Sequence, residues 1–464
     1  MFTNIEVEHF QGFKLTQNID LAPITLIFGA NSAGKSSIFR LFSLLKQSTE
    51  NAHTGMSPSY MGKDIDLVSF SNVVTSHDIN TEITVKTTFN IAANLGIRMS
   101  MVIDKFGVQR FGYGLIKAGQ HEVGAGGFEI SFERSGEVNA FQCVAIAGNK
   151  ASFSAAFPEV PWEQIDLQKF KKAFTNKSNI WFLNTHFYPE NRELYTRKPN
   201  LESVIARIIT ARLGSMYASK VRNSDFIGPL RMIPGRVVST VQSGAPDVTD
   251  SRGLLGYLRG SDFAIEGASK WIDKITEGAF SLKLVSFNQP EFSFLGDFSA
   301  LLLIDKRTNE GASLSDVGVG ISQVLPIIVK LISMSQSEIN GEDTGDSLDK
   351  AEPSDNLPTI FIEQPELHLH PRAQAELADL FVEYAKPSSG QPPIQIVAET
   401  HSESLIIRLQ RRLREGTISP GDISVLYVEK TDQGSNVISL PVNANGTFLV
   451  DWPMDFADSR LRDY

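Results

Sequence analysis

Eight residues near the N-terminus, GANSAGKS from Gly29 to Ser36, constrain this chain more than any others. They follow the continuous apolar run PITLIF, which predicts a buried strand, and they precede KSSIFRLFSLLKQ, whose apolar residues recur at helical spacing. The pattern G-x-x-x-x-G-K-[ST] between a strand and a helix is typical of a phosphate-binding loop. Its glycines let backbone N–H groups turn inward, and the helix N-terminus adds a positive partial charge. The stretch predicts an α/β sheet with a nucleotide site at one strand end.

Two side chains of this loop carry most of the expected chemistry. Lys35 can reach the β- and γ-phosphates of a nucleotide, and the hydroxyl of Ser36 can ligate Mg²⁺. A site of this kind needs a carboxylate at the end of a neighbouring buried strand to hold Mg²⁺ through water. Glu363 follows the apolar run TIFI in that position, within IFIEQPELHLHP. The alternative is that Glu363 only caps the following helix.

A third strand end comes with VAETHSES, where His401 follows another apolar run. Since the carboxyl ends of parallel strands gather at one edge of a sheet, we expect His401 beside the γ-phosphate, bonded to it or to the attacking water. The alternative is a purely structural histidine.

The segment LSDVGVGISQVLPIIVKL, from Leu314, places Gly318 and Gly320 before an apolar helix expected to begin near Ile321. This is a second helix N-terminus with accessible backbone donors, and one subunit needs only one such terminus. We therefore expect this segment to complete a site in a partner subunit, which makes the active unit a dimer. A glycine-bearing turn before a core helix is the alternative.

The order of the elements predicts an α/β fold interrupted by a long insertion. Strand and helix alternate in residues 1–75 and again in 225–464, which we expect to form the ATPase parts. Residues 76–158 are rich in Val, Ile, Phe and Thr with Gly or Asn between runs, which is typical of an antiparallel β lobe. Residues 159–224 return to helical periodicity and form a helical insertion.

Charge and composition exclude several kinds of protein. A net charge of -10 argues against a dedicated nucleic-acid binder, although a local basic groove stays possible. Cys143 is the one cysteine, so the chain has no internal disulfide. Residues 335–355 hold seven acids and one lysine, which predicts a mobile surface loop. No apolar run approaches the ~18 residues of a membrane span, so we expect a cytoplasmic, soluble protein without membrane contact.

Taken together, GANSAGKS, LSDVGVGISQ, IFIEQPELHLHP and ETHSES resemble the ABC-type ATPases of the SMC, RecF and OLD (overcoming lysogenisation defect) group. FIGPLRMIPGR (226–236) and GTFLVDWPMDF (446–456) are similar to the DUF3696-bearing AAA ATPases of bacteria. Residues 75 to 220 carry no motif of these families. Several such relatives are anti-phage defence ATPases of the Septu and PARIS types, which work with a nuclease or toxin effector.

The resemblance implies ATP and Mg²⁺ as cofactors and a role for each motif residue. Glu363 takes the magnesium-side position of Walker B beside Ser36, Gln364 stands where the catalytic glutamate is usual, and His401 matches the switch histidine. Such proteins dimerise around two ATP molecules, each held by Walker A of one subunit and the signature of the other. The Walker A cradle would comprise Gly29, Asn31, Gly34, Lys35, Ser36 and Ser37, and the signature segment would comprise Ser315, Gly318, Gly320, Ser322 and Gln323.

The residue that activates the hydrolytic water stays open at this stage. Gln364 is neutral at every accessible pH and cannot be a general base, but a glutamine can orient water. Glu366 is ionised by default and is a plausible base. Because the usual catalytic position is altered, we expect slow turnover.

Two functions compete. The first is a nucleotide-gated dimeric switch, capable of further oligomerisation, that controls a nuclease or toxin effector in anti-phage defence. The second is a DNA-repair or chromosome-associated ATPase whose helix at 403–416 contacts DNA phosphates; its candidate residues are Arg408, Arg411, Arg412 and Arg414. A third, weaker option is a standalone nuclease or phosphotransferase. His368 and His370 suggest a metal pair, but we favour structural packing. Only 35 residues follow Glu429, so we expect no nuclease domain of the Toprim type in this chain.

Overall fold

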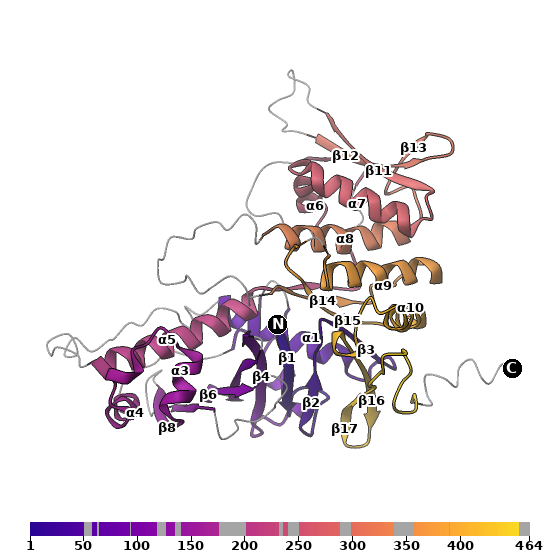
Figure 1. The fold of residues 1–464 in the computed structure, drawn as a ribbon. Coiled ribbons are helices and arrows are strands. Elements are labelled where there is room, and N and C mark those ends of the chain that lie inside the picture. The colour runs from indigo at the N-terminus through magenta and orange to yellow at the C-terminus, as the bar shows by residue number, and fades with distance from the viewer. Residues whose placement is uncertain are drawn as a thin grey trace.

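The computed structural model describes residues 1–50, 58–62, 65–92, 94–117, 127–134, 141–175, 201–231, 235–239, 250–287, 298–337, 357–388 and 390–453 (Figure 1). Most of the acidic segment expected to be a mobile loop, residues 338–356, lies outside these ranges, as does the end of the GTFLVDWPMDF motif. Of the helices within them, none is both long enough and apolar enough to cross a membrane.

A six-stranded, mostly parallel sheet forms the core, in the order β17-β16-β3-β15-β14-β9. Five strands run parallel, and only β17 (Gly434–Ser439) pairs antiparallel, with its neighbour β16. The parallel strands are β3 (Ile24–Gly29), β9 (Ser224–Ile227), β14 (Thr359–Glu363), β15 (Gln395–Glu399) and β16 (Ile423–Thr431). Every residue of β3 and β15 is buried, which explains their unbroken apolar runs.

Helices cover both faces of this sheet. On one face, α1 (Lys35–Glu50) packs its apolar stripe against Ile27 and Phe361, whose ring lies 4.5 Å from that of Phe42. On the other face, Leu26 and Phe28 pack against residues of α8 (Val319–Ser337), α9 (Pro371–Ala385) and α10 (Glu403–Arg414). Side chains of each strand alternate between these two cores, and the sheet is therefore buried on both sides.

An antiparallel seven-stranded sheet forms a lobe beside the core, in the order β2-β1-β4-β5-β6-β7-β8. It contains the N-terminal strands β1 (Phe2–Glu8) and β2 (Gln17–Asp20), so it extends across the boundary expected near residue 75. The remaining strands are β4 (Ile83–Ala92), β5 (Leu95–Asp104), β6 (Gly107–Lys117), β7 (Glu129–Arg134) and β8 (Phe141–Ala147).

Two connections fix this lobe to the core. The side-chain amide of Gln395, the first residue of β15, accepts from the N–H of Phe2 at 2.9 Å and donates to the Phe2 carbonyl at 2.7 Å. The long helix α5 (Leu201–Arg222) also contacts α1 and β9. Shorter helices accompany the lobe: α2 (Phe70–Val73), α3 (Lys150–Ala156) and α4 (Leu167–Thr175).

A third, smaller sheet lies beyond α8, at the top of Figure 1. Its strands follow the order β10 (Val238–Ser239), β12 (Phe298–Asp305) and β11 (Phe280–Phe287), and β13 (Gly311–Ser313) also pairs with β12. It is packed on α6 (Ser251–Arg259) and α7 (Asp262–Ile275). The sequence periodicity predicts only α7 in this stretch. The described residues thus form an α/β fold with an antiparallel β lobe and additional helices.

Candidate nucleotide-binding site

The loop between β3 and α1 has the backbone of a phosphate cradle. Gly29 and Gly34 have φ values of +147° and +107°, and a Cβ on Gly29 would overlap the carbonyl oxygen of Val428 in β16. A Cβ on Gly34 would lie 2.5 Å from Oγ of Ser435. Both positions therefore require glycine. Asn31 is exposed on the loop, and Ser37 is buried with its N–H bonded to the Gly34 carbonyl at 3.1 Å.

Lys35 and Ser36, the first residues of α1, are turned toward a buried acid. The ammonium group of Lys35 donates to the carbonyls of Gly29 and Ala30 at 3.0 and 2.9 Å, and it lies 3.7 Å from a carboxylate oxygen of Glu399. The hydroxyl of Ser36 donates to the other oxygen of Glu399 at 2.7 Å. Burial lowers the pKa of Lys35, while the charge of Glu399 opposes that change.

Glu399 is the residue that the sequence-based site assignment omitted. It is the last residue of β15, which lies between β3 and β14, and it pairs in register with Glu363 at the end of β14. The available signal was an acid that follows the apolar run at residues 396–398, two residues before His401. Two carboxylates therefore stand side by side at the carboxyl edge of the sheet, next to Ser36.

Glu363 lies where the sequence predicted, at the edge of the sheet. Burial raises the pKa of its carboxyl group, and the neighbouring charge of Glu399 adds to that rise. Arg40 and Arg231 act in the opposite direction. The side chain thus sits in a partly desolvated acidic pair, which a divalent cation would stabilise.

The turn after β14 carries Gln364 and Glu366. Gln364 has a left-handed backbone, with φ of +44°, and its N–H donates to the Glu399 carbonyl at 2.8 Å. One carboxylate oxygen of Glu366 accepts from the backbone N–H of His401 at 2.7 Å. The other oxygen of Glu366 and Nε2 of His401 are buried, and neither has a hydrogen-bond partner among the described residues.

Buried polar atoms without partners are rare and call for an explanation. Burial raises the pKa of Glu366 and lowers the pKa of His401, which the charge of Lys35 lowers further. Lys35 in turn feels the charge of Glu366. These two polar atoms therefore face the same small region as the phosphate-loop lysine, and a bound ligand or water would satisfy them.

The signature segment packs against the turn after β14 in the same subunit. Its helix α8 begins at Val319, two residues before the expected start, and a Cβ on Gly320 would lie 2.5 Å from the carbonyl oxygen of His368. Gly318 has open space around its Cα, and Ser315 is exposed with its hydroxyl 2.9 Å from that of Ser313. Ser322 and Gln323 are buried.

Arg231 is a second residue that the site assignment omitted. It lies within the FIGPLRMIPGR motif, is 7% exposed, and donates from Nη2 to the carbonyls of Glu363 and Gln364 at 2.6 and 3.3 Å. Burial lowers the pKa of Arg231 to about 10, and the negative charges of Glu366 and Glu363 act in the opposite direction. The motif was visible in the sequence, but its contact with residues more than 130 positions away was not.

His368 and His370 do not form a metal pair in the described part of the chain. Both are exposed, and Nδ1 of His370 accepts from the N–H of Arg372 at 3.4 Å as the cap of α9. Nowhere among the described residues do three His, Cys, Asp or Glu side chains gather as a metal-binding group.

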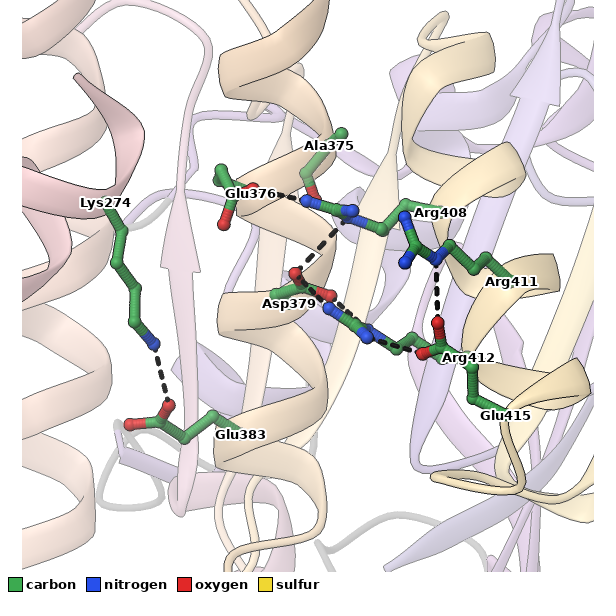
Figure 2. Close-up of polar contacts among 9 residues, drawn as sticks. All are labelled: Lys274, Ala375, Glu376, Asp379, Glu383, Arg408, Arg411, Arg412 and Glu415. Carbon is green, nitrogen blue, oxygen red and sulfur yellow. Dashed lines mark hydrogen bonds and ion pairs between the residues drawn. The ribbon is translucent and has the colours of Figure 1, made fainter. Parts of the chain in front are cut away.

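Three of the four arginines of α10, Arg408, Arg411 and Arg412, are engaged with acids (Figure 2). Arg412 donates to both oxygens of Asp379 on α9 at 2.6 Å, and Arg408 contacts Asp379 at 3.3 Å and also pairs with Glu376. Arg411 pairs with Glu415 on its own helix at 2.7 Å. These ion pairs neutralise much of the positive charge that a contact with DNA phosphates would need.

Comparison with known families assigns part of the chain. Residues 257–406 match the AAA ATPase domain family. The match covers the signature segment, Glu363, Glu366 and His401, but not the phosphate-binding loop, and it spans about a third of the 464 residues. No curated protein matches the chain.

Several solved structures are similar to this chain at low identity. An SMC head bound to the C-winged helix domain of ScpA is 13% identical over 95% of this chain and 97% of that one, with a TM-score of 0.43. The SMC head of Thermotoga maritima is 9% identical over 95% and 99%, with a TM-score of 0.39. The Pyrococcus furiosus Smc head bound to the C-terminal domain of ScpA is 13% identical over 100% and 98%, with a TM-score of 0.40. At these scores, nothing about the function of this chain follows.

Proposed function

We propose that this chain is a Mg²⁺-dependent ATPase of the ABC type that acts as a slow, nucleotide-gated dimeric switch. The observation that carries the proposal is a pair of buried polar atoms, Glu366 Oε2 and His401 Nε2, which lack hydrogen-bond partners among the described residues and lie close to the phosphate-loop lysine. The match of residues 257–406 to an ATPase domain supports the same reaction, ATP and water to ADP and phosphate.

When phosphate binds, Lys35 would exchange its present hydrogen-bond acceptors for phosphate oxygens. Its ammonium group donates to two loop carbonyls, and these neutral acceptors are replaced at little cost by a negatively charged phosphate oxygen. The N-terminus of α1 adds its positive partial charge at the same place. The cradle residues named from the sequence are thus suited to the β- and γ-phosphates.

The residues present also fit a magnesium ion. Hydroxyl and carboxylate oxygens are the ligands that Mg²⁺ prefers, and Ser36, Glu363 and Glu399 supply three of them at one sheet edge. We assign these three residues to hold the ion, together with the nucleotide. When bound, Mg²⁺ supplies charge neutralisation for the transferred phosphoryl group.

The buried environment favours Glu366 over Gln364 as the group that activates water. Glu366 is held by the N–H of His401 through one oxygen, which leaves its other oxygen free to accept a proton from water. Its raised pKa brings it closer to the range in which a carboxylate is an effective general base. Gln364 contributes its backbone, which fixes the turn through the Glu399 carbonyl.

The dimer, the effector and the defence role rest on the resemblance described for the sequence. The signature segment from Ser315 to Gln323 would meet the nucleotide of a partner subunit, and the closed dimer would control a nuclease or toxin. Expression with the neighbouring gene in phage-challenged bacteria tests this role. Plating efficiency should fall, and Lys35→Ala should restore it.

Phosphate release from ATP with Mg²⁺ tests the enzyme. Glu366→Gln should lower kcat about 100-fold while ATP binding persists, and Gln364→Glu should also change kcat. The control is Glu383→Gln, on the exposed side of α9, which should leave kcat unchanged. If neither Glu366→Gln nor Gln364→Glu changes the rate, the assignment of the water-activating turn is wrong. If the unaltered protein neither binds nor hydrolyses ATP, the proposed function is wrong.

DNA binding is the alternative, and it is tested in the same assay. A dimer that grips DNA should hydrolyse ATP faster when duplex DNA is added, and the stimulation should fall steeply with salt. Because Arg408 and Arg412 are paired with acids of α9, we expect no stimulation through α10.

A further inference from the structure

Arg231 connects two segments that the proposed function uses separately. It lies shortly after β9, the edge strand beside β14, and its guanidinium group reaches the turn that carries Glu366. Nη2 donates to the carbonyls of both Glu363 and Gln364, at 2.6 and 3.3 Å. These carbonyls lie three and two residues before Glu366, the proposed water-activating residue.

On its other side Arg231 is bonded to the signature helix. The side-chain amide of Gln323 accepts from the backbone N–H of Arg231 at 3.3 Å and donates to its carbonyl at 2.9 Å. Nη1 of Arg231 also lies 3.4 Å from the backbone carbonyl of Gln323. The glutamine of the signature is therefore committed to a contact within its own subunit, and α8 is tied to the turn through one arginine.

A second contact joins the same two segments. Gly320, at the start of α8, lies so close to His368 that a Cβ would come within 2.5 Å of the His368 carbonyl oxygen. On its far side the turn is held by the bond from the Gln364 N–H to the Glu399 carbonyl. The turn is thus fixed between the signature helix and β15, which leaves it little freedom to move independently of either.

The chemistry of Arg231 argues for a functional role beyond stability. A buried guanidinium group is costly to desolvate, and Nε of Arg231 is buried without a hydrogen-bond partner among the described residues. An apolar side chain of similar size would fill the site without that cost. Arginine is the side chain whose planar fork bonds two carbonyls at once while it also contacts a third segment.

We propose that Arg231 is a positioning residue that couples the signature helix α8 to the water-activating turn after β14. Engagement of the signature by a partner subunit's nucleotide would then be transmitted, within the same subunit, to Gln364 and Glu366. The proposal rests on the proposed ATPase function and adds a route from dimer closure to hydrolysis. Arg231 touches neither phosphate nor water in this route and acts through the turn.

The test compares Arg231→Lys with Arg307→Ala in the full-length protein. Lysine keeps the charge but loses the fork, whereas Arg307 is a largely exposed arginine after β12, paired with Asp305 at 3.0 Å and outside the candidate site. For each variant we would measure the midpoint of thermal unfolding, the Kd for ATP with Mg²⁺, and kcat. We expect Arg231→Lys to lower kcat between about 10-fold and 100-fold with Kd unchanged, and Arg307→Ala to change neither.

Gln323→Ala supplies the second arm. It removes the amide that holds the backbone of Arg231, so it should lower kcat in the same direction, and the double variant with Arg231→Lys should be no slower than the slower single variant. A purely additive pair, or an Arg231→Lys variant with full kcat, would overturn the coupling. A loss of ATP binding in proportion to the fall in melting temperature would also overturn the coupling, because it would show that Arg231 has only a structural role. If Arg231→Lys fails to fold, the kcat of Gln323→Ala decides alone.

These outcomes differ from failure of the proposed function. An unaltered protein without ATP binding or hydrolysis would refute the ATPase itself. An unaltered protein that hydrolyses ATP, with variants at Arg231 and Gln323 that do so equally well, would refute only the coupling.

Discussion

The carboxyl edge of the parallel sheet and the surface between α9 and α10 are both rich in charge, yet their charges are satisfied in different ways. Between α9 and α10, Asp379 accepts from both Arg408 and Arg412, and Glu415 accepts from Arg412 and Arg411 (Figure 2). At the sheet edge, Glu399 accepts from the Ser36 hydroxyl and pairs with the Lys35 ammonium group, and two buried polar atoms, Glu366 Oε2 and His401 Nε2, lack partners among the described residues. A network in which every charge has a partner has a structural role, whereas buried polar atoms without partners mark a place where a bound ligand would add stability.

The largest effect should come from Lys35→Ala, which removes the one cation buried at the sheet edge beside Glu399. ATP hydrolysis should fall by about 100-fold to 1000-fold, because the γ-phosphate loses its charged donor. Lys386→Ala, which removes an exposed lysine paired with Asp422, should leave hydrolysis unchanged. Phosphate release measures both, and equal rates in the two variants would remove the distinction between the two regions.

Glu399→Gln should weaken metal binding while the fold persists. It removes one of two adjacent carboxylates but keeps an acceptor for the Ser36 hydroxyl, so the Mg²⁺ concentration for half-maximal activity should rise about 10-fold to 100-fold. Electron paramagnetic resonance of Mn²⁺ in the presence of a nonhydrolysable ATP analogue gives a readout independent of turnover. A wild-type Mn²⁺ affinity in this variant would show that Glu399 does not hold the ion.

The pH dependence of hydrolysis should report on Glu366. Burial raises the pKa of this carboxyl group above its usual value, and a general base must be deprotonated, so the acid limb of the rate profile should lie above pH 4.5. As the pH falls through that raised pKa, the rate should fall, and Glu366→Gln should lack this limb. Persistence of the limb in the variant would assign it to another group.

The smallest effects should come from the α9–α10 surface. Asp379→Asn leaves two arginines with weaker partners and should cost about 1 to 3 kcal/mol of unfolding free energy. Arg411→Ala, at an exposed ion pair, should change it by less than about 0.5 kcal/mol. Thermal unfolding with and without added salt measures both. A change in the Kd for ATP in either variant would contradict the separation of the two regions.

The spacing of apolar residues within one short segment was enough to predict several helices and strands. The strand, loop and helix around Lys35 form as expected, and α9 spans the whole of PRAQAELADLFVEYA. These segments were predictable because burial of one face imposes a period on neighbouring residues. The boundaries assigned to the four regions stay a prediction, although β1 pairs with β4, which lies beyond residue 75.

The parts that were missed depend on partners distant in the sequence. Glu399 gains its meaning from register with Glu363 and from the Ser36 hydroxyl, 363 residues away. Arg231 reads as a loop arginine until its contacts with Gln323 and Glu363 are known. The sheet formed by β11 and β12 was not predicted because its strands lack clean alternation of buried and exposed residues. Strand pairing and ion pairing are long-range tertiary contacts, which the local spacing of residue types does not predict.

The amide of Gln395 gives the antiparallel lobe a mechanical place in this scheme. It bonds both backbone groups of Phe2 at the start of β15, and four residues later the same strand ends at Glu399. β15 is hydrogen-bonded on both sides, to β3 and to β14, and it carries Gln395 at one end and Glu399 at the other. The first strand of the chain is therefore attached to the same strand that supplies Glu399 to the candidate site, so the antiparallel lobe and that site share one structural element.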